Sequence, residues 1–182
     1  MQPQKYLTRS LSELAGSGQY LFTLSDVRVL LPLLSEAAFK TLLSRAVKDG
    51  SLTRFCRGLY LYPRADSSSG LLLFHAAARL RADRFNYISL ETALSEAGVI
   101  SQAPINWIML MSSGRSSIIP CGNWGTIEYV HTCRTPDDVS GQLIYDGRCR
   151  LWRASVALAL RDMRATRRNL DLIDWSVAHE SV

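Results

Sequence analysis

The chain lacks any long apolar run. Its 182 residues contain no stretch that approaches the roughly 18 apolar residues needed to span a bilayer. The start, MQPQKYLTRSLSELAG, is polar and amphipathic and differs from a secretory signal peptide. We therefore expect a cytoplasmic protein with no membrane partner. Because 47% of the residues are hydrophobic and 20% are charged, the chain has enough apolar material to fold around a core.

Cysteine and histidine are scarce. No CxxC pair occurs among the four cysteines, Cys56, Cys121, Cys133 and Cys149. This spacing argues against a disulfide framework and the common zinc motifs, so we expect reduced, partly buried thiols. His131 and Cys133 face the same side of one expected strand and could begin a metal site with Cys121 or Cys149. Without a close-spaced second pair, buried strand residues are the stronger interpretation, and we expect no metal and no cofactor.

Motifs for enzyme chemistry are also missing. The sequence has no HExxH, no GxSxG and no phosphate-binding glycine loop. Asp137 and Asp138 follow Pro136 in an expected turn, which favours loop carboxylates over a catalytic pair. We expect no enzymatic activity. A nucleic-acid-processing enzyme that uses His131, Asp137 and Asp138 is the weakest alternative.

A short polar segment, ADSSSG at residues 65–70, has the composition of a linker and divides the chain into domains of residues 1–64 and 71–182. Positive charge is concentrated in the first domain, which has nine Lys and Arg against four Asp and Glu. The net charge of the whole chain is +5. This distribution is expected if the first domain binds a polyanion.

Spacing and capping residues predict three helices and a hairpin in the first domain. The expected helices are Gln4–Ala15, Leu24–Leu31 and Glu36–Asp49, and the expected strands are Leu52–Cys56 and Leu59–Tyr62. Thr23 and Asp26 form a capping-box pattern at the second helix, which Pro32 ends. Ser35 is placed to cap the third helix, and Gly50 to close it.

This order of elements is typical of a winged helix-turn-helix, in which the third helix enters the major groove and the hairpin contacts the flanking backbone. Polar side chains occupy the outer face of the third helix, and arginines occupy the hairpin. The candidate DNA-binding residues are Lys40, Thr41, Ser44, Arg45, Lys48, Arg54 and Arg57. The alternative is an ordinary solvated helix face. We favour DNA binding because the caps, the glycine and the arginines of the hairpin agree with one architecture.

The second domain has a mixed pattern. We expect helices at Leu71–Ala82, Leu90–Ala97 with Ser89 as its cap, Ala154–Arg168 and Leu170–Ala178. We expect strands at Tyr87–Ile88, Ile105–Met111, Ser117–Ile119, Thr126–Cys133, Leu143–Tyr145 and Arg150–Trp152. The predicted class is therefore α+β: a winged helix-turn-helix followed by a mixed α/β domain with an antiparallel or mixed sheet.

A second basic surface is a further candidate. Four arginines recur in the last long helix, namely Arg161, Arg164, Arg167 and Arg168. They could bind a second polyanion or a partner, or they could form a plain solvated face, and the sequence leaves both open.

Three segments resemble the AbiEi family, the antitoxins of type IV toxin-antitoxin systems. The segments are FTLSDV (Phe22–Val27), LLSRAVKDGSLTRFCRGLYLY (Leu42–Tyr62) and YISLETALSEAGVI (Tyr87–Ile100). The first two match the family's winged-helix domain, and the third matches the strand and helix that open its C-terminal domain. Beyond Ile100 only ASVALALRDM (Ala154–Met163) loosely matches, without the family's proline and glutamate.

The resemblance implies two roles. The first domain would bind inverted repeats in its own promoter as a dimer or as cooperative monomers, and so repress its operon. The second would counteract a nucleotidyltransferase-like toxin, with direct contact left open, in a phage-defence system. The alternative is a stand-alone winged-helix regulator whose second domain binds a ligand or a protein.

Overall fold

The computed structural model describes residues 2–64, 69–102 and 104–181. The chain folds as a mixed α+β protein and divides into two compact units, Met1–Leu72 and Leu73–Val182. Of the expected linker 65–70, residues 65–68 lie outside the described residues. Within the described part of the chain, no helix has the length and apolar character to span a membrane.

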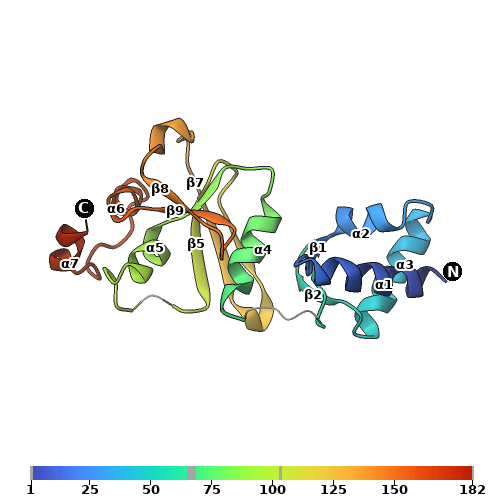
Figure 1. Ribbon diagram of the computed structural model, residues 1–182. Helices are drawn as coiled ribbons and strands as arrows, with labels where there is room; N and C mark the ends of the chain where they lie inside the picture. The colour runs from blue at the N-terminus through green and yellow to red at the C-terminus, as the bar shows by residue number, and fades with distance from the viewer. Residues whose placement is uncertain (1, 65–68, 103, 182) are drawn as a thin grey trace. The chain divides into compact units, whose positions relative to one another are not determined.

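The first unit contains three helices and a three-stranded sheet (Figure 1). Its elements are α1 (Pro3–Gly16), β1 (Leu21–Thr23), α2 (Leu24–Leu30), α3 (Glu36–Lys48), β2 (Thr53–Cys56) and β3 (Leu59–Leu61). The sheet order is β1-β3-β2, and both pairings are antiparallel. The three predicted helices and the hairpin are confirmed, with ends that shift by one residue at most. The short strand β1 was not predicted.

Local capping explains where these helices begin and end. The Thr23 side chain accepts the Asp26 N–H at 3.2 Å, and the Asp26 carboxylate accepts the Thr23 N–H at 2.6 Å, which confirms the capping box. The Ser35 hydroxyl accepts the Ala38 N–H at 3.3 Å. After α3, Gly50 has a φ of +78°, a conformation that glycine adopts without the strain of a Cβ. Thr23 also ends β1 and pairs with Leu59 of β3, so no loop separates this strand from α2.

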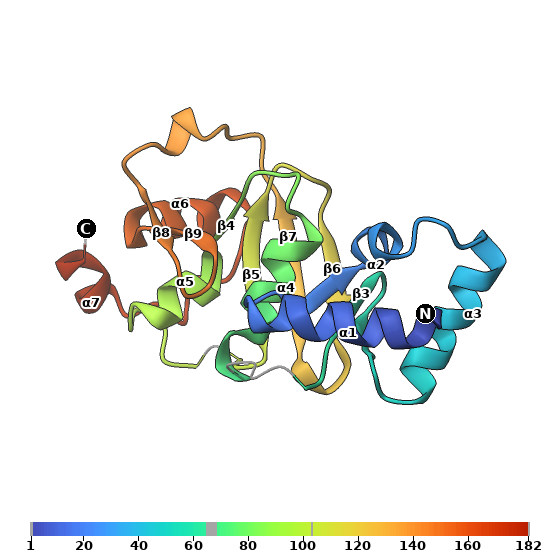
Figure 2. The same cartoon turned by 45° about the vertical axis from the view of Figure 1, so that its right-hand side comes forward.

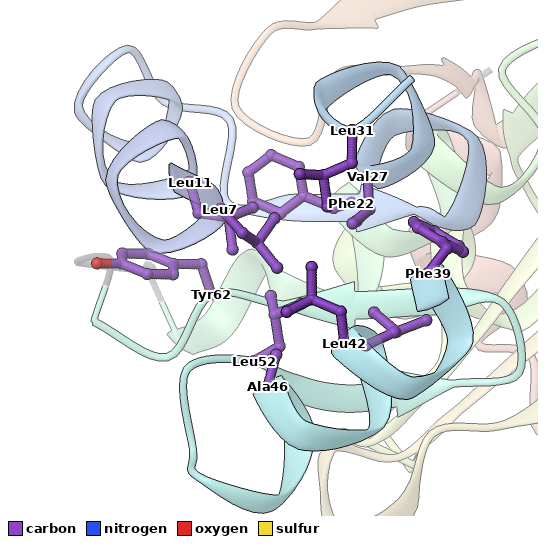
Figure 3. Close-up of a cluster of buried hydrophobic side chains, with 11 residues drawn as sticks. Leu7, Leu11, Phe22, Val27, Leu31, Phe39, Leu42, Ala46, Leu52 and Tyr62 are labelled. Atoms are coloured by element: carbon purple, nitrogen blue, oxygen red, sulfur yellow. The ribbon is translucent and has the colours of Figure 1, made fainter. Parts of the chain in front are cut away.

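An apolar core holds the first unit together (Figure 3). Side chains from all three helices meet Phe22 of β1, and the buried members are Leu7, Leu11, Phe22, Val27, Leu31, Phe39, Leu42, Leu43, Ala46, Leu52 and Tyr62. Each large apolar side chain removed from water in this way contributes about 1.5–3 kcal/mol. The inner face of α3 is buried in this core, with Val47 partly buried at its edge.

The second unit is built on a six-stranded mixed sheet. Its helices are α4 (Leu72–Leu80), α5 (Leu90–Glu96), α6 (Val156–Ala165) and α7 (Trp175–Glu180), with short 3-10 turns at Gly122–Trp124 and Asp137–Val139. A further 3-10 turn, Ser69–Leu71, ends the first unit just before α4. The strands of the second unit are β4 (Asn86–Ile88), β5 (Trp107–Ser112), β6 (Ser117–Pro120), β7 (Thr126–His131), β8 (Leu143–Asp146) and β9 (Leu151–Ala154). Each of these helices and strands corresponds to a predicted element, although its ends differ from the predicted ones.

Strand order in this sheet is β6-β7-β5-β4-β9-β8. The pairs β5–β7 and β4–β9 are parallel and the other three are antiparallel, so the sheet is mixed. Helix α4 covers one face, where the Tyr129 hydroxyl donates to the Ala77 carbonyl at 2.7 Å. Helices α5 and α6 pack against each other on the other face (Figures 1 and 2).

A buried carboxylate anchors α6 to the sheet. Asp162 is fully buried and accepts hydrogen bonds from the Tyr87 hydroxyl at 3.1 Å, the Ser89 hydroxyl at 2.7 Å and the Arg134 guanidinium. Ser89 occupies the N-cap position of α5, as predicted, but its side chain makes no capping hydrogen bond. Its hydroxyl instead donates to Asp162, because a buried carboxylate must have its oxygens satisfied. Burial raises the pKa of Tyr87, which keeps this phenol a hydrogen-bond donor.

Helix α6 is shorter than predicted. It ends at Ala165, and Arg167 has a φ of +55°, so Arg167 and Arg168 lie beyond the helix. The Arg168 guanidinium pairs with Glu91 at 3.4 Å and with Glu128. These carboxylates come from α5 and β7. The helical spacing of the four arginines therefore did not predict where Arg168 lies, because its partners belong to other elements.

Candidate nucleic-acid interface

The outer face of α3 carries the side chains that the sequence singled out. All five are exposed: Lys40, Thr41, Ser44, Arg45 and Lys48. At 100° per residue they fall within an arc of about 140° on the helix. The opposite side of α3 is committed to the core through Phe39, Leu42 and Ala46. The two faces of one helix therefore separate packing from possible contact with a partner.

A groove runs between α3 and the β2–β3 hairpin. Its volume is about 410 Å³, with Phe39 and Leu43 among its apolar lining residues. Lys40, Ser44 and Arg54 supply polar groups to the same groove. The structure thus brings candidate residues from the helix and from the hairpin to one hollow. Such a hollow suits an anionic backbone lying against the apolar stems of long cationic side chains.

One carboxylate belongs to this groove. Glu36 lies on its lining and pairs with Lys40 at 3.3 Å, four residues along α3. The two side chains are 67% and 71% exposed, and an ion pair in that setting is worth little because water screens it. Lys40 can exchange this partner for a phosphate at small cost.

The hairpin is a minimal one. Cys56 pairs with Leu59, so Arg57 and Gly58 alone form the connection. Gly58 has a φ of +81°, which a tight reversal of this kind requires. Arg57 at the tip and Arg54 on β2 are both exposed. The hairpin therefore presents two cations on a short and well-defined support.

The start of α1 contributes residues that the sequence did not reveal. A second hollow of about 470 Å³ is lined by Thr41 and Arg45 of α3 together with Gln2 and Gln4. Gln4 is held there, because its side-chain amide donates to the Asp49 carboxylate just after α3. Two amides capable of donating and accepting thus lie beside the basic face. No local pattern could have predicted this, since more than 30 positions of sequence separate the two segments.

Helix electrostatics explain only part of the basic face. Arg45 and Lys48 lie in the last turn of α3, where a cation is stabilised by the helix dipole without any partner. Lys40 lies in the middle of the helix, and Arg54 and Arg57 lie outside it. For these three cations the dipole offers no explanation.

The four arginines of the second candidate basic surface do not share one environment. Arg161, Arg164 and Arg167 are exposed, and the Arg164 guanidinium lies 5.7 Å from the centre of the Trp175 ring. Arg168 is turned toward Glu91 and Glu128 instead. Its charge is therefore committed inside the unit.

The scarce cysteines and histidines do not gather into a metal centre. Cys56, Cys121 and Cys149 are buried, and burial raises the pKa of the Cys149 thiol to about 12. His131 and Cys133 lie together, with 3.5 Å between Nε2 and Sγ. Both side chains are exposed, so the interpretation as buried strand residues was wrong. Across the described ranges 2–64, 69–102 and 104–181, no three His, Cys, Asp or Glu side chains are grouped to hold an ion.

The neighbouring carboxylates have a local role. Asp138 accepts hydrogen bonds from the Thr135 N–H at 2.7 Å and the Thr135 hydroxyl at 2.9 Å, and these bonds lower its pKa. Asp137 begins the same short turn and is exposed. The Asp138 carboxylate thus stabilises the turn that it belongs to.

Comparison with known proteins gives no further guide. No model of a known protein family matches the chain, and no curated protein matches it significantly. The residues and their arrangement must carry any functional argument.

Proposed function

We propose that the first unit is a winged helix-turn-helix that binds double-stranded DNA, with α3 as the recognition helix and the β2–β3 hairpin as the wing. One observation carries this proposal: Lys40 and Ser44 on the exposed face of α3 and Arg54 of the hairpin border the same groove. If the outer face of α3 were only a solvated surface, nothing would require polar residues of the helix and of the hairpin to border one groove. Cations on a helix and on a hairpin beside it match the way this motif contacts bases and the flanking phosphates.

The core geometry supports the same proposal. Helices α2 and α3 are joined by a short turn that contains Pro32 and ends at Ser35, the N-cap of α3, and β1 pairs with β3 beside the hairpin. Because the buried faces of all three helices share one core, α3 is held rigidly with its outer face free. A rigid support of this kind favours the reading of a duplex.

We further propose that the protein is an antitoxin that represses its own operon. The support is the resemblance to AbiEi antitoxins together with the positions of its three segments. They coincide with the start of α2, with α3 through β3, and with β4 through α5. The partners would be promoter DNA with inverted repeats, bound by a dimer or by cooperative monomers, and a nucleotidyltransferase-like toxin. The alternative is a stand-alone regulator whose second unit binds a ligand or a protein.

DNA binding is tested by fluorescence anisotropy with a duplex from the region upstream of the gene, over a series of salt concentrations. We expect the combined change Lys40→Ala, Arg45→Ala and Arg57→Ala to weaken binding. The slope of log affinity against log salt should become shallower by about 3, because each phosphate contact contributes roughly one counterion.

A charge-matched control comes from the same unit. Lys5, Arg9 and Arg64 line a different hollow, beside α1, and their joint change to Ala removes the same net charge. This control should leave the slope nearly unchanged. Equal losses for the two triple variants would show general charge attraction and would contradict the assigned interface.

The antitoxin role is tested by co-expression with the product of a neighbouring nucleotidyltransferase-like gene, scored by growth. The intact chain should restore growth, and so should the full chain carrying the Lys40, Arg45 and Arg57 changes, since neutralisation is assigned to the second unit. Failure of the intact protein to restore growth would favour the stand-alone regulator.

A further inference from the structure

Beside the end of β7, a histidine is held in one orientation by the turn between β5 and β6. The His131 backbone N–H donates to the Ser116 hydroxyl at 2.9 Å, and its ring nitrogen Nδ1 lies 2.9 Å from the Gly114 carbonyl oxygen. A carbonyl oxygen can only accept, so Nδ1 carries the proton. In the neutral ring, Nε2 is then a bare acceptor.

That acceptor faces a thiol. Cys133 Sγ lies 3.5 Å from His131 Nε2. The residues on either side of Cys133 are also fixed: the Thr132 N–H donates to the Ser112 carbonyl at 2.8 Å, and the Arg134 N–H donates to the Thr132 hydroxyl at 3.2 Å. The short segment therefore holds the thiol in place without burying it.

Exposure distinguishes this thiol from the others. Cys133 is exposed, whereas Cys56, Cys121 and Cys149 are buried. A nucleophile beside a base, with that base oriented by a third group, is the arrangement that activates thiols in proteins. Cys133, His131 and the Gly114 carbonyl supply these three parts.

We propose that Cys133 is a thiol-modification site, with His131 as its base and a low-molecular-weight disulfide as the reacting class. Cys133 Sγ attacks one sulfur of the disulfide and gives its proton to His131 Nε2. The disulfide S–S bond breaks as a new S–S bond forms to Cys133, and the leaving sulfur departs as a thiolate that takes up a proton. The Cys133 sulfur is oxidised and the leaving sulfur is reduced, so the exchange needs no other oxidant.

The proposal is tested on the intact, folded protein with two probes, the anionic dithiobis-nitrobenzoate and the neutral dithiodipyridine, each followed by absorbance of the released thiol. We expect one fast thiol per chain. Incubation with oxidised glutathione should add one glutathione by intact mass, and a reducing agent should remove it. The change Cys133→Ser should abolish the fast phase and the adduct.

The role of His131 is tested by His131→Asn, because an Asn amide can still donate to Gly114 but cannot accept the thiol proton. We expect the fast phase to slow by about 100-fold with both probes, the lower end of what a positioned general base contributes. The matched control is His179→Asn in α7, another exposed histidine, which should leave both rates unchanged. Slowing with the anionic probe alone would indicate charge attraction, and unchanged rates would indicate mere exposure. Either result, or a fast phase that survives Cys133→Ser, overturns the proposal.

Discussion

The two units bury different kinds of side chain. In the first, the core is apolar and the cations lie outside it, with Ser10 as the one polar residue among those described as buried. In the second, the buried polar residues are His75, Asn86, Ser89, Thr92, Ser112, Thr132 and Asp162. The second unit also pairs Arg134 and Arg168 internally.

The two units also differ in the role of their charged side chains. A cation that satisfies a buried carboxylate is part of the fold, and its removal leaves an unpaired group in a poorly solvated site. Exposed cations of α3 satisfy no buried group of the unit, since the one partner of Lys40, Glu36, is itself exposed, and they are available for a partner. The first unit can therefore lose its basic face without unfolding, whereas the second cannot lose its internal pairs so easily.

The strongest test of this contrast is Asp162→Ala in the second unit. Its removal leaves Arg134, Tyr87 and Ser89 without their shared acceptor, so we expect the free energy of unfolding to fall by about 3 kcal/mol or more. Chemical denaturation measures the total, and amide hydrogen exchange assigns the loss to the second unit. Asp162→Asn, which keeps the size and one acceptor, should cost less. An Asn variant as stable as the parent protein would mean that shape and a neutral acceptor, rather than the buried charge, are what matter.

A smaller effect is expected from Thr23→Ala in the first unit. The substitution removes the hydroxyl that accepts the Asp26 N–H, and losing such a cap costs about 1 kcal/mol. Exchange of amides in α2 should accelerate while amides of the second unit stay protected. Thr23→Ser, which restores the acceptor, is the matched control. If Ser behaved like Ala, the capping bond would not be the cause.

The smallest expected effect is a pH dependence at α7. Asp174 accepts the N–H groups of Ser176 and Val177 and the Ser176 hydroxyl, and these bonds lower its pKa. A lowered carboxyl pKa in the folded state gives stability that is present above the unfolded pKa and is lost as the pH falls through the folded pKa. Asp174→Ala should therefore destabilise α7 at neutral pH and match the parent protein in strong acid. A difference that persists in acid would contradict this cause.

Sequence reasoning worked best where neighbours along the chain determine the outcome. The caps Thr23 and Ser35 and the spacing of Phe39, Leu42 and Ala46 are local patterns, and the corresponding helices formed where predicted. Strand β1 was missed because its partner, β3, lies almost 40 positions away and gives no local signal.

The second unit shows the limit more sharply. Ser89 has a residue type and a position that favour capping, but its hydroxyl donates a hydrogen bond to Asp162, which lies far along the chain. The spacing of Arg168 agrees with the predicted helical row of arginines, but in the structure its guanidinium pairs with Glu91 and Glu128 inside the unit. The partner of a buried charge depends on which residues lie near it in the folded chain, and residue spacing in a single sequence does not show this.

The direct join at Thr23 has a thermodynamic consequence. Thr23 ends β1, pairs with the hairpin strand β3 and caps α2, and α2 shares one core with the proposed recognition helix α3. The recognition helix and the wing therefore belong to one packed body. Association with a duplex would then order few residues of the protein. Its heat-capacity change should follow the apolar area removed from water, without the larger decrease that accompanies folding of a segment on binding.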